Sequence, residues 1–141
     1  MTWTQSLDAA AQYVQGLIAD VTGIRSAPTA PRDLEVAFPA SVCFPRSGRF
    51  ENPSSGLIIG YHTLVIQIHY PRVELSRAYT TIVPYLEKIA EVLIDDPTLG
   101  ATVTTIVEDI QYSFGQMAYG EVPTLGWQFE VTVKVSYTES S

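Results

Sequence analysis

The last part of the chain contains an uninterrupted alternation of apolar and polar residues, and this pattern constrains the fold more than any other. Side chains of a β-strand point alternately to the two faces of its sheet. The alternation therefore predicts a strand with one buried and one wet face. The apolar positions are Trp127, Phe129, Val131, Val133, Val135 and Tyr137, and the polar positions are Gln128, Glu130, Thr132, Lys134 and Ser136.

Three other segments are predicted to be strands. In 57–70, Leu64, Ile66, Ile68 and Tyr70 form one apolar face, and Pro71 ends the pattern. The short segment 40–44 lies between two prolines, which is typical of an edge strand or of a strand limited by its ends, because proline cannot donate to a ladder. The third segment, 102–114, alternates more weakly.

Apolar residues recur at three- and four-residue steps in 4–22 and again in 75–93, which predicts two helices. Pro84 lies inside the second pattern, so we expect a kink there or a helix that restarts. Antiparallel sheets with one wet face carry helices on the other. The sequence therefore predicts an α+β fold, with a mostly antiparallel sheet of four to five strands and two helices packed on one face.

Length, charge and cysteine content narrow the class of protein. The 141 residues predict a single domain spanning 1–141. Eight basic and 15 acidic residues give a net charge of −7, which argues against a large nucleic-acid-binding face. Charged residues make up only 16%, which suggests that partners cover some of the surface. A single cysteine excludes an internal disulfide, and no apolar run is long enough for a membrane span, so we expect a soluble intracellular domain.

Two segments are predicted to be irregular and to contact partners. The segment RSGRFENPSSG, residues 46–56, is rich in glycine, proline and serine, so we expect an exposed, mobile loop. Its contact residues would be Arg46, Arg49, Phe50, Glu51 and Asn52, and a solvated hairpin tip is the equally weighted alternative.

The second segment, residues 115–126, is predicted to be a late turn. Aromatic residues and a methionine gather around it, and they would either complete the core, which is the favoured interpretation, or form a subunit patch. These residues are Tyr112, Phe114, Met117 and Tyr119.

The residues with reactive side chains do not form a catalytic pattern. His62 and His69 are seven apart on one predicted strand and would point to opposite faces, so they cannot chelate one metal ion. Asp95 and Asp96 precede a proline at a helix end, where a turn is expected. Cys43 has no base nearby in the sequence. We therefore predict no enzyme activity, no metal site and no cofactor.

Several segments resemble the tail terminator, or tail completion, proteins of long-tailed bacteriophages. The resemblance rests on the N-terminal helix running into VTGIRSAP, the strand GYHTLVIQIHY, the helix ending LIDDPTLG, the turn QMAYGEVP and the terminal strand TLGWQFEVTVKVSYTES. It covers most of the chain after Leu7 but leaves RSGRFENPSSG unmatched.

This resemblance implies an assembly role in the virion. Such proteins form a homohexameric ring that caps the tail tube, ends its polymerisation and gives a docking surface to the neck. The expected partners are the chain itself, the tail tube protein and a neck or head-completion protein, with DNA passing through the bore and no specific nucleic-acid or membrane binding. The expected location is the head-proximal end of the tail, and the host cytoplasm during assembly. The alternatives are a neck or head-completion protein of the same virion and a small-ligand-binding α+β module.

Overall fold

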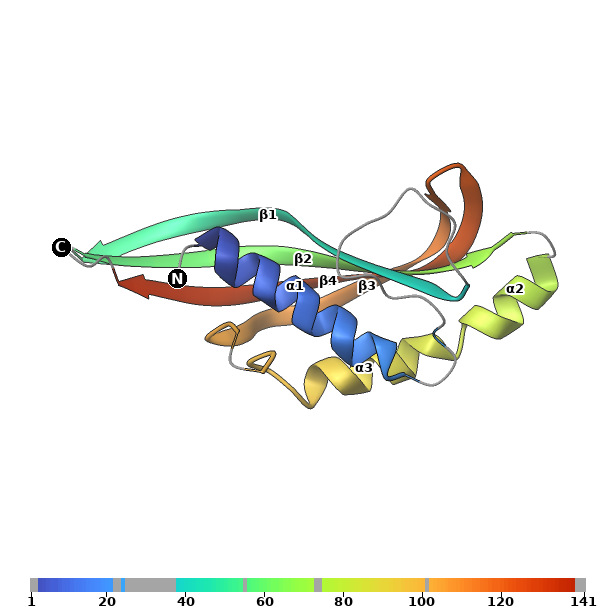
Figure 1. Cartoon of the computed structure of the whole chain (residues 1–141), viewed down its shortest axis with the longest axis horizontal. Coiled ribbons are helices and arrows are strands. Elements are labelled where there is room, and N and C mark those ends of the chain that lie inside the picture. Colours follow the sequence, from blue (N-terminus) through green and yellow to red (C-terminus); the bar gives the residue numbers. More distant parts are fainter. Residues whose placement is uncertain are drawn as a thin grey trace.

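The computed structural model describes residues 3–21, 24, 38–54, 56–72, 75–100 and 102–138. Within these ranges the order of elements is α1 (Trp3–Ala19), β1 (Ala40–Ser54), β2 (Leu57–Pro71), α2 (Leu75–Ile82), α3 (Tyr85–Ile94), β3 (Thr105–Tyr119) and β4 (Val122–Thr138). The long strands run side by side, and the helices lie along one side of them (Figure 1). The predicted α+β class is confirmed.

The strands of the described residues form a four-stranded sheet in the order β1-β2-β4-β3, and every neighbouring pair is antiparallel. The edges are therefore β1 and β3, which confirms the prediction of an edge strand at 40–44. No helix among the residues described is long and apolar enough to cross a membrane.

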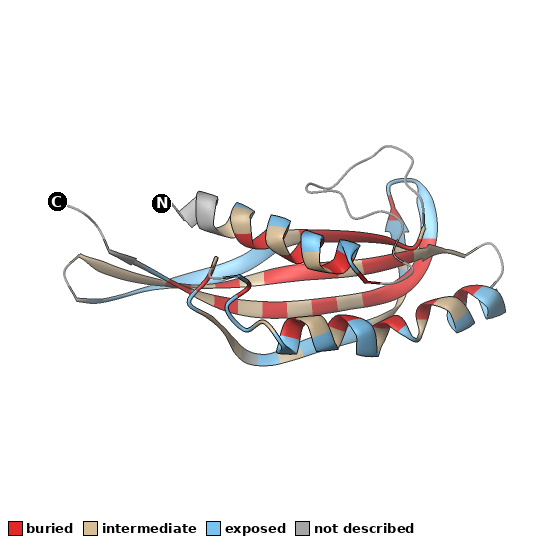
Figure 2. Cartoon of the chain, turned by 60° about the horizontal axis from the view of Figure 1, so that its bottom comes forward, coloured by how far each residue is buried: buried red, intermediate tan, exposed pale blue. Residues whose placement is uncertain are grey.

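One face of the sheet carries the hydrophobic core. The apolar positions of the two central strands are Leu64, Ile66, Ile68, Phe129, Val131 and Val133, and each is 0% exposed. They pack with Ala10, Val14 and Ile18 of α1 and with Ile89 and Leu93 of α3. Buried stripes on the helices turn towards this face (Figure 2). The apolar side chains that alternate along β2 and β4 therefore all point to one face of the sheet, and the helices cover that face.

The second predicted helix is interrupted where Pro84 occurs in the sequence. α2 ends at Ile82, and α3 begins at Tyr85 with Pro84 as its N-cap residue. The indole Nε1 of Trp127 donates a hydrogen bond of 2.9 Å to the carbonyl of Ile82. A buried tryptophan of β4 therefore satisfies a backbone acceptor that the end of α2 leaves open.

The turn after α3 connects that helix to α1. Asp96 accepts hydrogen bonds from the hydroxyl of Tyr13, at 2.6 Å, and from the amide of Gly100, at 3.1 Å. The Tyr13 bond is the larger of the two causes that lower the pKa of Asp96. Gly100 has a φ of +65°, and a Cβ there would lie 2.4 Å from the Tyr13 ring. The Asp95–Asp96 pair therefore belongs to a structural turn, as expected.

The prediction of a loop at 46–56 is wrong for most of that segment. β1 continues through Arg46 and Phe50 to Ser54, paired with β2. The register shifts between Pro45 and Ser47 and again between Glu51 and Ser54. These β-bulges accommodate residues that the ladder cannot pair, and an edge strand tolerates proline. The glycine, proline and serine residues of this segment therefore lie mostly in a bulged edge strand, which ends at Ser54 before β2 begins at Leu57.

The predicted turn at 115–126 is also too long. Residues 115–119 belong to β3 and residues 122–126 to β4, so the turn between them consists of Gly120 and Glu121. Gly120 has a φ of +59°, a conformation typical of a tight hairpin. Cross-strand hydrogen bonds override the weak strand propensity of the glycines and proline here. The sequence also predicts a helix stop at Gly23 and an extended connector at 26–33, and both lie outside the described residues.

Candidate assembly surfaces

Midway along the sheet, the face opposite the core carries polar side chains that bond to one another across the strands. Gln67 Nε2 donates a hydrogen bond of 2.8 Å to Gln128 Oε1, and the hydroxyls of Thr63 and Thr132 lie 3.2 Å apart. These residues alternate with the core positions along β2 and β4, and none belongs to the core cluster that includes the helices. We call this surface the uncovered face.

Cations gather on the uncovered face near the β1–β2 hairpin. Arg49, Tyr61 and Lys134 form one row across β1, β2 and β4. The guanidinium carbon of Arg49 lies 4.1 Å from the centre of the Tyr61 ring. Arg49 also pairs with Glu51, and Arg46 pairs with Glu130 of β4. Because Glu130 alternates with the buried Val131, the Arg46 guanidinium lies on this face as well.

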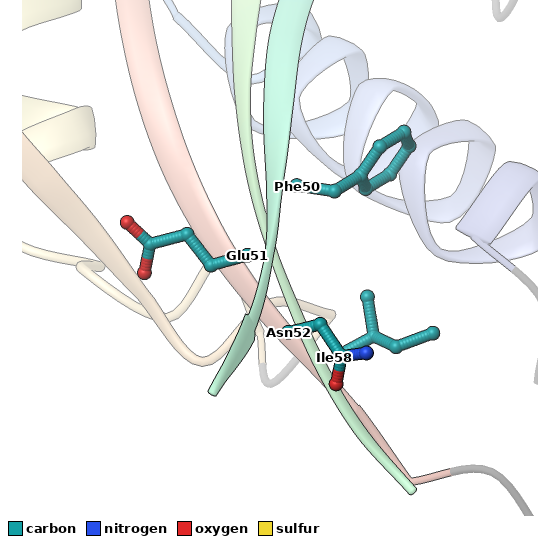
Figure 3. A pocket seen from close by; sticks show the side chains of 4 residues that line it. All are labelled: Phe50, Glu51, Asn52 and Ile58. Atoms are coloured by element: carbon teal, nitrogen blue, oxygen red, sulfur yellow. The ribbon is translucent and has the colours of Figure 1, made fainter. Parts of the chain in front are cut away.

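The five predicted contact residues of β1 divide between the two sides of the strand. Phe50 and Glu51 point to opposite sides (Figure 3). Phe50 is 67% exposed and meets the His62 ring edge-on, with 5.7 Å between the centroids. A hollow of about 330 Å³ is lined by Phe50, Glu51, Asn52 and Ile58 of this hairpin. Phe50 thus presents an apolar ring at the surface, whereas Arg46, Arg49 and Glu51 belong to the uncovered face.

The four late residues do not form one cluster, because β3 continues through them and its side chains alternate. Tyr112 and Phe114 lie on the side of the helices, where Phe114 packs on Trp127 at 4.7 Å and on Tyr79 of α2 at 5.7 Å between ring centroids. Tyr112 is 58% exposed and Tyr79 is 54% exposed. Tyr79 had gone unnoticed because it also fits the helical apolar pattern.

Tyr119 is buried, as the core interpretation predicts. It is 7% exposed and lies on the opposite side of the sheet, where Met117 is half-buried. Its ring packs edge-on against Phe38 and His69, with centroids 6.1 Å and 5.4 Å away. Tyr119 therefore belongs to a second, small core with Ala40 and Val42. Only Tyr112 and Phe114 of the four are available as a surface patch.

His69 packs against Tyr119 of the small core and is itself only 1% exposed. Its Nδ1 lies 2.6 Å from the Thr124 hydroxyl and its Nε2 lies 2.9 Å from Gln67 Oε1. Burial lowers the pKa of His69 to about 4, so the ring is neutral at pH 7. A neutral ring with both nitrogens bonded to neutral groups is a structural histidine.

The remaining reactive groups are separated and inert. His62 and His69 lie on opposite faces, as expected from their spacing. Cys43 is buried, and burial raises the pKa of its thiol to about 12, so the thiolate is not formed at pH 7. Across the described ranges, no three side chains of histidine, cysteine, aspartate or glutamate come together as a metal site would need.

An acidic row runs along the outer side of α3. Glu87, Glu91 and Asp95 are four residues apart and exposed, while Ile89 and Leu93 between them are buried. Residues four apart lie on the same face of a helix. The spacing of these carboxylates is visible in the sequence, but it indicates only a solvated side of the helix opposite the apolar stripe.

These surfaces are the features of the structure that suit contact with other macromolecules. Compared with known proteins, the chain matches no protein-family model and no curated protein sequence.

Proposed function

We propose that this protein is a structural subunit that assembles into a closed hexameric ring capping the tube of a bacteriophage tail. The observation that carries the proposal is the one-sided sheet. Helices cover one face, and the other face holds glutamine, threonine, arginine and lysine in an ordered array. An ordered polar face of this kind suits contact with a second protein surface.

The bacteriophage part of the proposal is supported by the resemblance of individual segments. GYHTLVIQIHY corresponds to most of β2, LIDDPTLG to the end of α3 and its turn, and TLGWQFEVTVKVSYTES to β4 and the residues after it. In this role the ring stops tube polymerisation and offers its other side to the neck protein. The net charge of −7 suits a bore through which DNA slides without being held.

The first experiment asks whether copies associate and whether the product recognises a tube end. We expect native mass spectrometry of the purified chain to show a hexamer, alone or after addition of assembled tail tubes. Negative-stain images should then show one ring at a tube end. A chain that stays monomeric in the presence of tubes, or one that forms open fibres, would contradict the proposal.

A second experiment tests the β1–β2 hairpin. Replacing Arg46, Arg49 and Phe50 together with serine should leave the melting temperature within a few degrees, because all three side chains are exposed. We expect this variant to reduce the joining of tails to heads. A matched variant with serine at Leu75, Arg77 and Glu121, also exposed, should join normally. Normal virion yield from the hairpin variant would refute its role.

A further inference from the structure

We propose that neighbouring copies join by placing the acidic row of α3 from one copy on the cationic part of the uncovered face of the next. This inference rests on the self-assembly proposed above and names the two surfaces that meet. The partner is a second copy of this chain, and the contact is head-to-tail.

Charge complementarity between the two surfaces is the first reason. On the uncovered face near the hairpin, Arg46, Arg49 and Lys134 outnumber Glu51 and Glu130, although the whole chain carries −7. α3 presents the opposite sign, with Glu87, Glu91 and the following Asp95 on its outer side. The one basic residue of α3, Lys88, lies against the ring of Tyr85, with Nζ 4.9 Å from the centroid.

The spacing of the charges is the second reason. Arg49 and Lys134 are separated by the width of two strand spacings, which is about 10 Å. Glu87 and Asp95 are eight residues apart on a helical path, which is about 12 Å along the axis. A helix crossing the strands therefore brings carboxylates close to both cations, with the Tyr61 ring between them.

The edges of the sheet give the third reason, because they disfavour the usual alternative of strand addition. β1 contains Pro45 and Pro53 and is bulged twice, while β3 is bulged between Val107 and Gln111. Prolines and bulges on an edge prevent pairing with another chain. Copies are thus directed to meet through a face and a helix.

The two surfaces lie on opposite sides of the sheet, since α3 packs on the core face and the cations occupy the uncovered face. A contact between unlike surfaces is heterologous, and it closes into a ring when the rotation allows. Two-fold pairing would instead place like charges together. The proposed contact is therefore heterologous, which is the kind of contact from which closed rings are built.

Charge reversal tests the contact. We expect Glu87→Lys with Glu91→Lys, and separately Arg49→Glu with Lys134→Glu, to raise the concentration needed for half-assembly at least about tenfold. The variant with all four changes should recover at least part of this loss, because the signs again match. A control, Asp8→Lys with Glu121→Lys, changes the net charge at exposed positions by the same amount as the α3 reversal and should assemble as the parent does.

The outcomes separate this inference from the proposed function. Rings from the parent chain that are indifferent to both reversals would overturn the contact and leave the ring intact as a proposal. Loss in each reversal without recovery in the fourfold variant would also overturn the contact. A parent chain that never associates with itself or with tubes would defeat both. Circular dichroism and thermal melts of each variant would show that the fold is retained.

Discussion

The two faces of the sheet share one backbone but are stabilised in different ways. On the helix-covered face, Leu64 and Val131 are opposite each other and are both 0% exposed. On the uncovered face, the neighbouring pair Thr63 and Thr132 is half-buried and joined through its hydroxyls. The first face depends on helices to exclude water, whereas the second is satisfied by bonds between its own strands. The two hydrogen-bonded pairs can therefore face away from the helices, because each pair bonds across the strands.

The largest difference in the free energy of unfolding should come from placing the same charge on each face. Val133→Asp puts a carboxylate among apolar side chains at a site 0% exposed, and we expect it to lower the free energy of unfolding by about 4 kcal/mol. Thr132→Asp, one residue earlier on the half-buried uncovered face, should cost about 1 kcal/mol or less. Urea denaturation measures both. If the Val133→Asp variant unfolds cooperatively and is as stable as Thr132→Asp, then Val133 does not point into the core.

The next effect is a loss of stability in acid that comes from the small core. The pKa of His69 is about 4 in the folded chain and near 6.5 when unfolded, so the unfolded state binds the proton first. Stability is complete above about pH 6.5 and falls as pH drops towards 4. We expect a loss of about 2 kcal/mol between about pH 7.5 and about pH 5. Burial also lowers the pKa of His62, which acts in the same direction.

Measuring unfolding free energy against pH for His69→Gln separates the two histidines. The amide cannot titrate, so the slope in this window should be much shallower than that of the parent and should reflect His62. Equal slopes in the two proteins would contradict a buried, neutral His69.

The third effect, similar in size to the second, concerns a glycine of β4 whose absent side chain would point to the side of the sheet opposite the core. A Cβ on Gly126 would lie 1.7 Å from the carbonyl oxygen of Ile68, which belongs to the backbone and cannot rotate away. We expect Gly126→Ala to cost about 2 kcal/mol. Gly115 is its partner across β3 and has open space around it, so Gly115→Ala is the control and should be close to neutral. Similar melting temperatures for both variants would contradict this close approach.

Much of the fold follows from the sequence where a single periodicity runs without interruption. The alternation of β4 and the helical spacing of α1 each specify one buried side, and Pro84 marks a helix break that needs no tertiary information. The predictions of a loop at 46–56 and a turn at 115–126 were wrong around Pro45, Pro53 and Gly115, which belong to strands. There the local residues favour turns, but hydrogen bonds from a long neighbouring strand hold them extended.

The sequence predicts the candidate surfaces only in part. The errors arise, as for the fold, because pairing between distant strands is not visible in a local pattern. Arg49 and Phe50 were found by residue type, but their division between two sides of a strand was hidden by the assignment of a loop. Tyr112 and Tyr119 were grouped because they are close in sequence, although an odd separation on a strand places them on opposite faces. The cationic row needs three strands to be in register, which no local pattern reveals.

The lateral bonds of the uncovered face have a consequence for how copies would meet. Gln67 and Gln128 already satisfy each other within a single copy, as do Thr63 and Thr132. A neighbouring copy that docks in a wrong orientation therefore need not break these hydrogen bonds, and it forms few new ones with these side chains. In the proposed ring, wrongly oriented contacts would be short-lived, and a partial ring could correct its geometry before the last subunit closes it.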